Sequence, residues 1–303
     1  MTAPIAVLGP GGVGGLVAAA LARAGEPVVI VAREETAASL QRTGLHVRSV
    51  ALGDFAVRPR AVTALSEPAS ALLVATKHRG LDAALDRIAA APGVVVPLLN
   101  GLEHMAGLRA RFGERVVAGV IRVESDRPAP GEIVQTSPGI RIDLAAPALP
   151  VAGPLDALAG ALERAGLAVR RGAPEPEVLW GKLVRLNALA LTTTAFAAPL
   201  GAIRSDPARS ADLEACVREA AAAARAEGAP IDPGAVLAEL RDAHAGLGSS
   251  MQRDVAAGRP PELDAIAGAV LRAAARHGLA APTVARLAGA VAAQAGISPP
   301  ASG

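Results

Sequence analysis

The chain is nearly free of aromatic and sulfur-bearing side chains. Its 303 residues include one Trp, three Phe, no Tyr and a single Cys. So few rings argue against a base-stacking platform for single-stranded nucleic acid. One thiol, Cys216, excludes an internal disulfide and a metal site built from several thiolates. The scarcity of cysteine fits a reducing compartment, and we expect a cytoplasmic protein.

Charge of one sign and long apolar runs are also missing. The formal net charge is +2, and Arg alternates with Asp and Glu along the chain, so no nucleic-acid partner is expected. No uninterrupted run of about 18 apolar residues occurs, which predicts no membrane span. The uncharged stretch 1–22 lacks a basic start and is interrupted by glycines, so we do not expect a signal peptide. The five histidines are scattered without metal-ligand spacing, and no metal is expected.

Lysine and asparagine are as rare as the aromatic residues. The chain has only two lysines, Lys77 and Lys182, and only two asparagines, Asn100 and Asn187. A lysine amine gives up its proton when it is partly desolvated, whereas Arg effectively does not. An Asn amide offers a donor and an acceptor in one small group. The four positions are therefore candidates for chemistry, although composition alone is explained equally well by chance.

The N-terminal segment has the pattern of a βαβ unit. An apolar run at 4–8 ends at Gly9, a glycine-rich turn and a helix-like segment follow, and a second β-branched run occupies 27–32. Strand, turn, helix and strand in this order indicate a parallel sheet with both faces covered. Further β-branched runs continue to about residue 146, where 132–137 and 139–146 are predicted to form an antiparallel pair.

The composition changes near residue 172. Beyond it the β-branched runs almost vanish, and long segments rich in Ala, Leu, Arg and Glu predict helices. The fold class expected is therefore an α/β Rossmann-like dinucleotide-binding domain, residues 1–172, followed by an all-α C-terminal domain, residues 173–303.

A glycine turn joins the first strand to the first helix. Gly9, Gly11 and Gly14 match G-x-G-x-x-G in the strand–turn–helix context that this motif requires. The first glycine permits the tight turn, the second lets a pyrophosphate approach the backbone, and the third allows close helix–strand packing. The helix start then presents N–H groups to the phosphates. We expect the cofactor to contact Gly9, Gly11, Gly12, Val13 and Gly14.

The residue after the second strand bears on the choice of cofactor. NAD sites usually carry Asp or Glu there to hold the ribose hydroxyls, whereas an Arg suits a 2′-phosphate. Arg33 occupies this place and favours NADPH, although Glu34 and Glu35 follow at once and keep NADH open.

Six segments together resemble the ketopantoate reductase (2-dehydropantoate 2-reductase) family. They occur in the family's order and span nearly the whole chain. The segments are AVLGPGGVGG (6–15), VATKHRG (74–80), LLNGLEH (98–104), PGEIVQT (130–136), LWGKLVRLN (179–187) and SSMQRDVAAGRPPELDAIAG (249–268). The last is the most specific, because the family couples Ser-Ser-Met to a Glu about a dozen residues later.

This resemblance implies reduction of the ketone of 2-dehydropantoate by NADPH, which gives pantoate for pantothenate and coenzyme A. It assigns Lys182 as the general acid, and Glu262 as the carboxylate that holds the substrate hydroxyl and helps position Lys182. Ser250 is the implied contact to the substrate carboxylate. Asn100 would bridge nicotinamide, ribose and substrate, and Lys77 would reach ribose or substrate. Each has a plainer alternative as a surface cation, a helix-start charge, a packing residue or a turn residue.

One departure from the family bears on the substrate. The family usually has an Asn four residues after the catalytic Lys and often another four further on, where this chain has Leu186 and Ala190. Asn187 is five residues after Lys182, so either a local helix bulge restores it as a substrate contact or two contacts are lost. The alternatives to ketopantoate are therefore another 2-oxo acid, or a non-catalytic NADP(H)-binding sensor. The sequence leaves the oligomeric state open, a homodimer included.

Overall fold

The computed structural model describes residues 3–301 and divides into two compact units. One unit contains the chain up to Leu99 together with His104–Val178, and the other contains Asn100–Glu103 together with the chain from Leu179 onward. The boundary that we predicted after residue 172 falls within the last strand, β12 (Ala168–Ala173).

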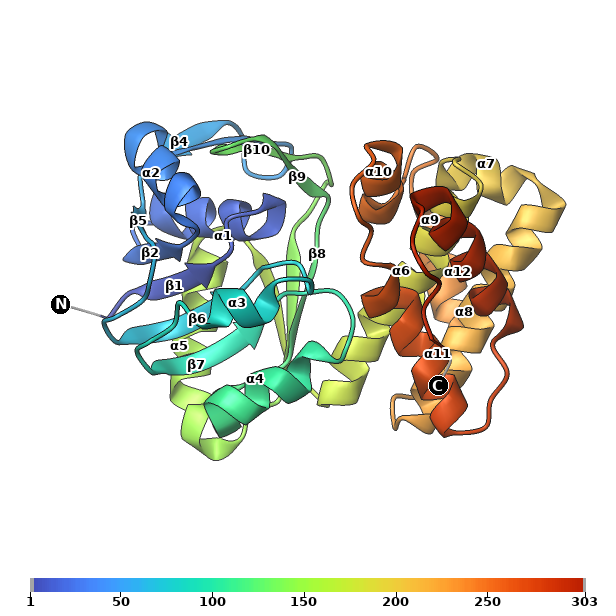
Figure 1. The fold of residues 1–303 in the computed structure, drawn as a ribbon. Helices are drawn as coiled ribbons and strands as arrows, with labels where there is room; N and C mark the ends of the chain where they lie inside the picture. The colour runs from blue at the N-terminus through green and yellow to red at the C-terminus, as the bar shows by residue number, and fades with distance from the viewer. Residues whose placement is uncertain (1–2, 302–303) are drawn as a thin grey trace. The chain divides into compact units, whose positions relative to one another are not determined.

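The first unit is built on a five-stranded parallel sheet of order β5-β2-β1-β6-β7. Its strands are β1 (Ile5–Leu8), β2 (Val28–Val31), β5 (Arg60–Val62), β6 (Ala69–Val74) and β7 (Pro92–Pro97). β1 and β2 are buried along their whole length, as expected for apolar strands covered on both faces. Figure 1 shows β1 leading directly into helix α1.

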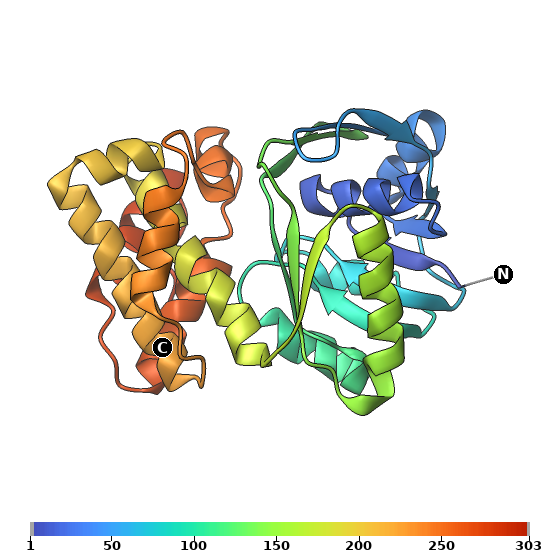
Figure 2. The same cartoon turned by 180° about the vertical axis from the view of Figure 1, so that it is seen from behind.

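Helices of the first unit cover this sheet. They are α1 (Gly12–Arg23), α2 (Glu34–Thr43), α3 (Leu81–Leu85), α4 (His104–Phe112) and α5 (Ala152–Arg164), with the short turns η1 (Gly113–Arg115) and η2 (Leu149–Val151). α5, in front of the sheet in Figure 2, packs against β6 and β7 and also contacts α1. Small residues of α1, Ala18, Ala19 and Ala20, are fully buried, which suits close helix–sheet packing.

Two smaller sheets complete the first unit and correct one prediction. Their orders are β4-β3-β10-β9 and β12-β11-β8, formed by β3 (Leu45–Ser49), β4 (Phe55–Val57), β8 (Gly119–Arg122), β9 (Ser125–Ala129), β10 (Glu132–Gln135), β11 (Arg141–Ala145) and β12. β10 and β11 were expected to pair, and that expectation is wrong.

The structure gives the reason for the error. The hairpin instead joins β9 to β10 through Gly131, which has a φ of +80° and therefore suits a tight turn. β10 also pairs with distant β3, where the Ser49 hydroxyl donates to the Gln135 side chain at 2.6 Å. These contacts hold β10 in its own sheet.

The second unit is helical, with no strand over residues 179–301. Its elements are α6 (Glu175–Ala195), which starts in the first unit, α7 (Leu200–Ser205), α8 (Pro207–Ala226), α9 (Pro233–Asp242), α10 (Ser250–Ala256), the π-helical turn η3 (Asp264–Gly268), α11 (Ala269–Arg276) and α12 (Pro282–Ala295). Asp206 and Asp232 cap α8 and α9 by accepting hydrogen bonds from first-turn N–H groups, each followed by a Pro. The expected α/β unit followed by a helical unit is confirmed.

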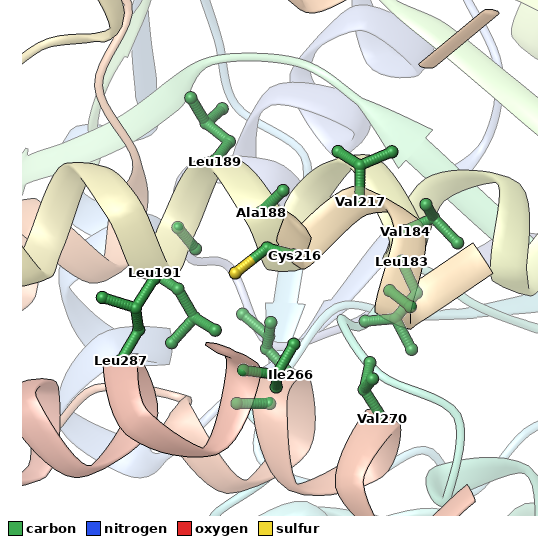
Figure 3. Close-up of a cluster of buried hydrophobic side chains, with 14 of the residues drawn as sticks. Leu183, Val184, Ala188, Leu189, Leu191, Cys216, Val217, Ile266, Val270 and Leu287 are labelled. Atoms are coloured by element: carbon green, nitrogen blue, oxygen red, sulfur yellow. The ribbon is translucent and has the colours of Figure 1, made fainter. Parts of the chain in front are cut away.

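The core of the helical unit is mostly aliphatic, with Trp180 as its one buried aromatic side chain among the described residues. Figure 3 shows Cys216 among side chains from α6, α8, η3, α11 and α12, including Leu183, Leu191, Ile266 and Leu287. Burial, together with nearby carboxylates, raises the pKa of the Cys216 thiol far above its usual value, so this sulfur packs as a small apolar group. Within residues 3–301, no helix has the length and apolar character needed to cross a bilayer.

Candidate functional site

The glycine turn has a shape that only glycine permits. Gly9 follows β1 with a φ of +89°, where a side chain would be strained. A Cβ on Gly14 would lie 2.2 Å from the carbonyl oxygen of Gly9, and one on Gly12 would lie 2.6 Å from that of Ser125. A Cβ on Gly11 would meet nothing within 4 Å. The turn is therefore tightly packed on its inner side and open at Gly11.

This open side fits a dinucleotide phosphate. Gly11 is the N-cap of α1, and no side chain caps the helix. The first turn of a helix has N–H groups without intrahelical partners, and the helix dipole adds partial positive charge there. The backbone of Gly11, Gly12 and Val13 would hold the phosphates, with no side chain standing between them.

Two residues that sequence reasoning missed support this turn. The Ser125 hydroxyl of β9 donates to the Gly12 carbonyl at 2.8 Å. Thr76 packs against Gly9, and its buried hydroxyl has no hydrogen-bond partner among the described residues. The only sequence signal for Thr76 is its position just after strand β6. Ser125 has no such signal, because its partner Gly12 lies 113 residues earlier in the chain.

Arg33 and Lys77 lie at the same edge of the sheet as the glycine turn. Arg33 follows β2 and Lys77 follows β6, and both strands run parallel to β1 as its neighbours. Carboxyl ends of adjacent parallel strands meet at one edge, which is where open α/β sheets bind ligands. Both side chains are exposed. Their predicted roles toward a cofactor remain predictions.

The helical unit brings together three of the predicted residues. The Lys182 ammonium donates to the side-chain oxygen of Asn100 at 2.8 Å, and the Asn100 amide nitrogen donates to Glu262 Oε2 at 3.0 Å. These bonds use the donor and the acceptor of one amide on two oppositely charged groups. All three side chains are partly buried, so the charges stand in a medium less polar than bulk water.

Each of the three residues has a distinct local support. Lys182 lies on α6, a 21-residue helix whose first turn carries Glu175 and Glu177 at the positive end of its dipole. Asn100 begins the segment that follows β7 and groups with the helical unit. Glu262 stands just before η3, and π-helical turns are frequent at functional sites.

Asn187 is placed differently. α6 is a continuous α-helix, so the bulge that would have restored Asn187 to the Lys182 face is absent. Five residues along a regular helix place it about 140° round from Lys182. Asn187 is 0% exposed, and neither polar atom of its side chain has a hydrogen-bond partner within residues 3–301. Leu186 packs against the helical core and Ala190 is fully buried within it.

The two serines of the Ser-Ser-Met motif lie in different environments at the start of α10. Ser249 is buried, accepts a hydrogen bond from the Gln252 N–H at the start of α10, and accepts another from the Thr193 hydroxyl at 3.0 Å. Ser250 is exposed, and its contact to the substrate carboxylate remains a prediction. Sequence reasoning gave no role to Ser249, although Ser before a helix is a standard N-cap signal.

No group of three or more His, Cys, Asp or Glu side chains positioned to hold a metal ion is found among the described residues.

A parallel sheet with a glycine turn at its carboxyl edge, followed by a helical unit that presents Lys182, defines a Rossmann-type oxidoreductase. The family model "Ketopantoate reductase PanE/ApbA" matches residues 5–146, and its C-terminal counterpart matches residues 177–295. The chain belongs to the ketopantoate reductase family. It is an oxidoreductase that uses a nicotinamide dinucleotide.

Relatives support this assignment over nearly the whole chain. A 2-dehydropantoate 2-reductase of Caulobacter vibrioides is 33% identical over 290 residues, covering 92% of this chain and 94% of that protein. The structure of a 2-dehydropantoate 2-reductase from Geobacter metallireducens has a TM-score of 0.86 at 29% identity, covering 95% and 98%. D-mandelate dehydrogenase with NADH and anilino(oxo)acetate shares the fold, with a TM-score of 0.86 at 19% identity, covering 97% and 98%.

We expect Gly11→Ala and Gly14→Ala to separate cofactor binding from folding. Gly11 has an ordinary φ of −77° and open space at Cβ, so Gly11→Ala keeps the melting temperature but weakens NADPH binding at least about tenfold. Gly14→Ala forces the backbone apart at Gly9 and lowers the melting temperature as well. Fluorescence titration and thermal unfolding check this, and wild-type NADPH affinity in Gly11→Ala would contradict it.

Proposed function

We propose that this protein reduces a 2-oxo acid with NADPH, with 2-dehydropantoate as the substrate and pantoate as the product. The observation that carries the proposal is the hydrogen-bonded series from Lys182 through Asn100 to Glu262. Family membership, and the name of the Caulobacter vibrioides relative, support the choice of substrate. We further infer a cytoplasmic location and a small-molecule substrate as the partner. Homodimer formation stays a prediction.

Lys182 is proposed as the general acid. When bound, NADPH supplies a hydride to the carbonyl carbon of the substrate. The Lys182 ammonium donates a proton to the carbonyl oxygen as negative charge develops on it. The ground-state ketone lacks this charge, which grows toward the transition state, so a fixed ammonium stabilises the transition state more than the ground state. An ammonium has three N–H donors, which allows it to hold Asn100 and a substrate oxygen together.

Asn100 and Glu262 orient this acid. The Asn100 oxygen accepts from Lys182, which fixes the direction of the amine, and Glu262 accepts from the other end of the same amide. A carboxylate has two oxygens and several acceptor sites, so Glu262 can also receive the substrate hydroxyl. Ser250, at the exposed start of α10, is proposed to contact the substrate carboxylate.

A second substrate class is favoured by one observation. At the usual Asn positions, Leu186 is partly buried against the apolar core of the helical unit and Ala190 is fully buried in it, and Asn187 is fully buried as well. An active site with fewer amide contacts holds the polar substituents of ketopantoate less strongly. The second candidate is therefore reduction of another 2-oxo acid by the same Lys182 chemistry.

Lys182 variants test the reaction itself. We expect Lys182→Ala to lower kcat for NADPH oxidation with ketopantoate by at least about a hundredfold, the usual contribution of a general acid. Lys182→Arg is the matched control, because it keeps the positive charge but cannot release a proton near neutral pH. It should be as slow as Lys182→Ala while NADPH affinity stays close to wild type.

The same assay, run with a panel of 2-oxo acids, separates the candidates. Highest kcat/KM for ketopantoate supports the first, and a strong preference for an unbranched acid supports the second. Tight NADPH binding without turnover of any 2-oxo acid, with NADPH affinity unchanged in Lys182→Ala, would contradict both candidates. The remaining function would then be a non-catalytic cofactor sensor.

Arg33 is proposed to select NADPH over NADH. Its exposed guanidinium at the end of β2 would pair with the 2′-phosphate. We expect Arg33→Ala to raise KM for NADPH about tenfold or more, the loss of one charge-assisted contact, with KM for NADH within about twofold. The control is Arg42→Ala. Arg33 is the N-cap of α2, and Arg42 is an exposed arginine in the last turn of the same helix. Equal changes for the two cofactors would contradict the assignment.

A further inference from the structure

The Arg272 guanidinium of α11 donates hydrogen bonds to two carboxylates, Glu103 and Asp264, which lie far from each other in the sequence. Its Nε and Nη2 donate to the two oxygens of Glu103 at 2.6 and 2.7 Å. Its Nη1 donates to Asp264 Oδ1 at 2.7 Å. The Arg272 side chain is only 23% exposed, and Glu103, followed by Asp264, raises the pKa of this guanidinium further above its usual value. A forked, charge-assisted contact of this kind is stronger than a single hydrogen bond between the same groups, although both carboxylates are exposed.

The two segments that Arg272 joins carry the residues of the proposed site. Glu103 ends the segment that Asn100 begins. Asp264 is the first residue of η3, two residues after Glu262. The carbonyl oxygen of Asp264 accepts from the N–H of Ala269 within the π-helical turn, and from Arg272 Nη2 at 3.2 Å. Arg272 therefore contacts both the side chain of Asp264 and the widened backbone of this turn.

Two glycines make room for this arrangement. A Cβ on Gly268 would lie 2.5 Å from Asp264 Oδ1 and 2.9 Å from Arg272 Nη1. Gly101, with a φ of +84°, brings the residue next to Asn100 so close to η3 that a Cβ there would lie 2.3 Å from the Ala265 carbonyl oxygen. The Asn100 segment and the turn after Glu262 are thus packed backbone against backbone, with the Arg272 fork beside them.

We propose that Arg272 is a positioning residue of the reaction, which clamps the Asn100–Glu103 segment to η3 and thereby sets the hydrogen bond between Asn100 and Glu262. Arg272 acts through these residues and touches neither substrate nor cofactor. The proposal rests on the proposed function, because it gives Asn100 and Glu262 their role beside Lys182. The glycine turn lies in the other unit, so the predicted phosphate contacts of the cofactor do not depend on the clamp.

The test compares Arg272→Gln with Arg276→Gln in the full-length protein. Arg276 also lies on α11 and also donates two bonds to one carboxylate, Glu227, but it is more exposed. We expect Arg272→Gln to lower kcat at least tenfold, with a smaller change in KM for NADPH, because Asn100 is only one of the predicted cofactor contacts. Hydrogen exchange should become faster in peptides covering 100–103 and 262–268. Arg276→Gln should change none of these.

A second variant guards against a general loss of folding. Glu103→Gln removes one side of the clamp from a partly exposed position, and it should give the same loss of kcat and the same local exchange. Wild-type kcat in both Arg272→Gln and Glu103→Gln would overturn the proposal, even if exchange increased. If the wild type turns over no 2-oxo acid, the proposed function fails. Unchanged exchange in 100–103 and 262–268 would then reject the clamp independently.

Discussion

The candidate site depends on one amide that serves two opposite charges. Asn100 offers its oxygen to the Lys182 ammonium and its nitrogen to the Glu262 carboxylate. Of the small side chains, only an Asn amide provides a strong acceptor and a strong donor side by side without a charge of its own. An Asp would repel Glu262, and a Ser could not span both partners. This requirement gives a physical reason for one of the two asparagines in a chain that otherwise does without them.

Much of the fold could be predicted because local chemistry specifies it. The strand–glycine–helix order fixes a turn at Gly9 that no other residue type tolerates, and apolar β-branched runs fix the strands of the parallel sheet. The helical second unit follows from the loss of β-branched runs beyond residue 172 and from the long segments rich in Ala, Leu, Arg and Glu. Rarity singled out Lys182 and Asn100, which the structure places in direct contact, while their roles in catalysis stay predictions.

The remainder depends on contacts between residues far apart in the chain. β10 joins β3 rather than β11, and the Arg272–Glu103 pair connects positions 169 residues apart, so neither has a local signature. The sequence left open whether a bulge returns Asn187 to the Lys182 face or two contacts are lost; α6 is regular and buries the Asn187 amide, so the bulge is absent. A shift of one residue in the helix decides which face of α6 Asn187 occupies. An Ala-rich sequence has little hydrophobic periodicity, so this face could not be determined from the sequence.

The most direct measurement of the central claim is kcat of Asn100→Asp with saturating NADPH and substrate. This substitution keeps the size of the side chain and the acceptor for Lys182, but it replaces the donor that faces Glu262 with a second carboxylate oxygen at about the same distance, near 3 Å. Like charges in this position break the link, and kcat should fall at least about tenfold, equal to about 1.4 kcal/mol in the barrier. Wild-type kcat in Asn100→Asp would contradict the account, because the amine would then be oriented without the amide bridge.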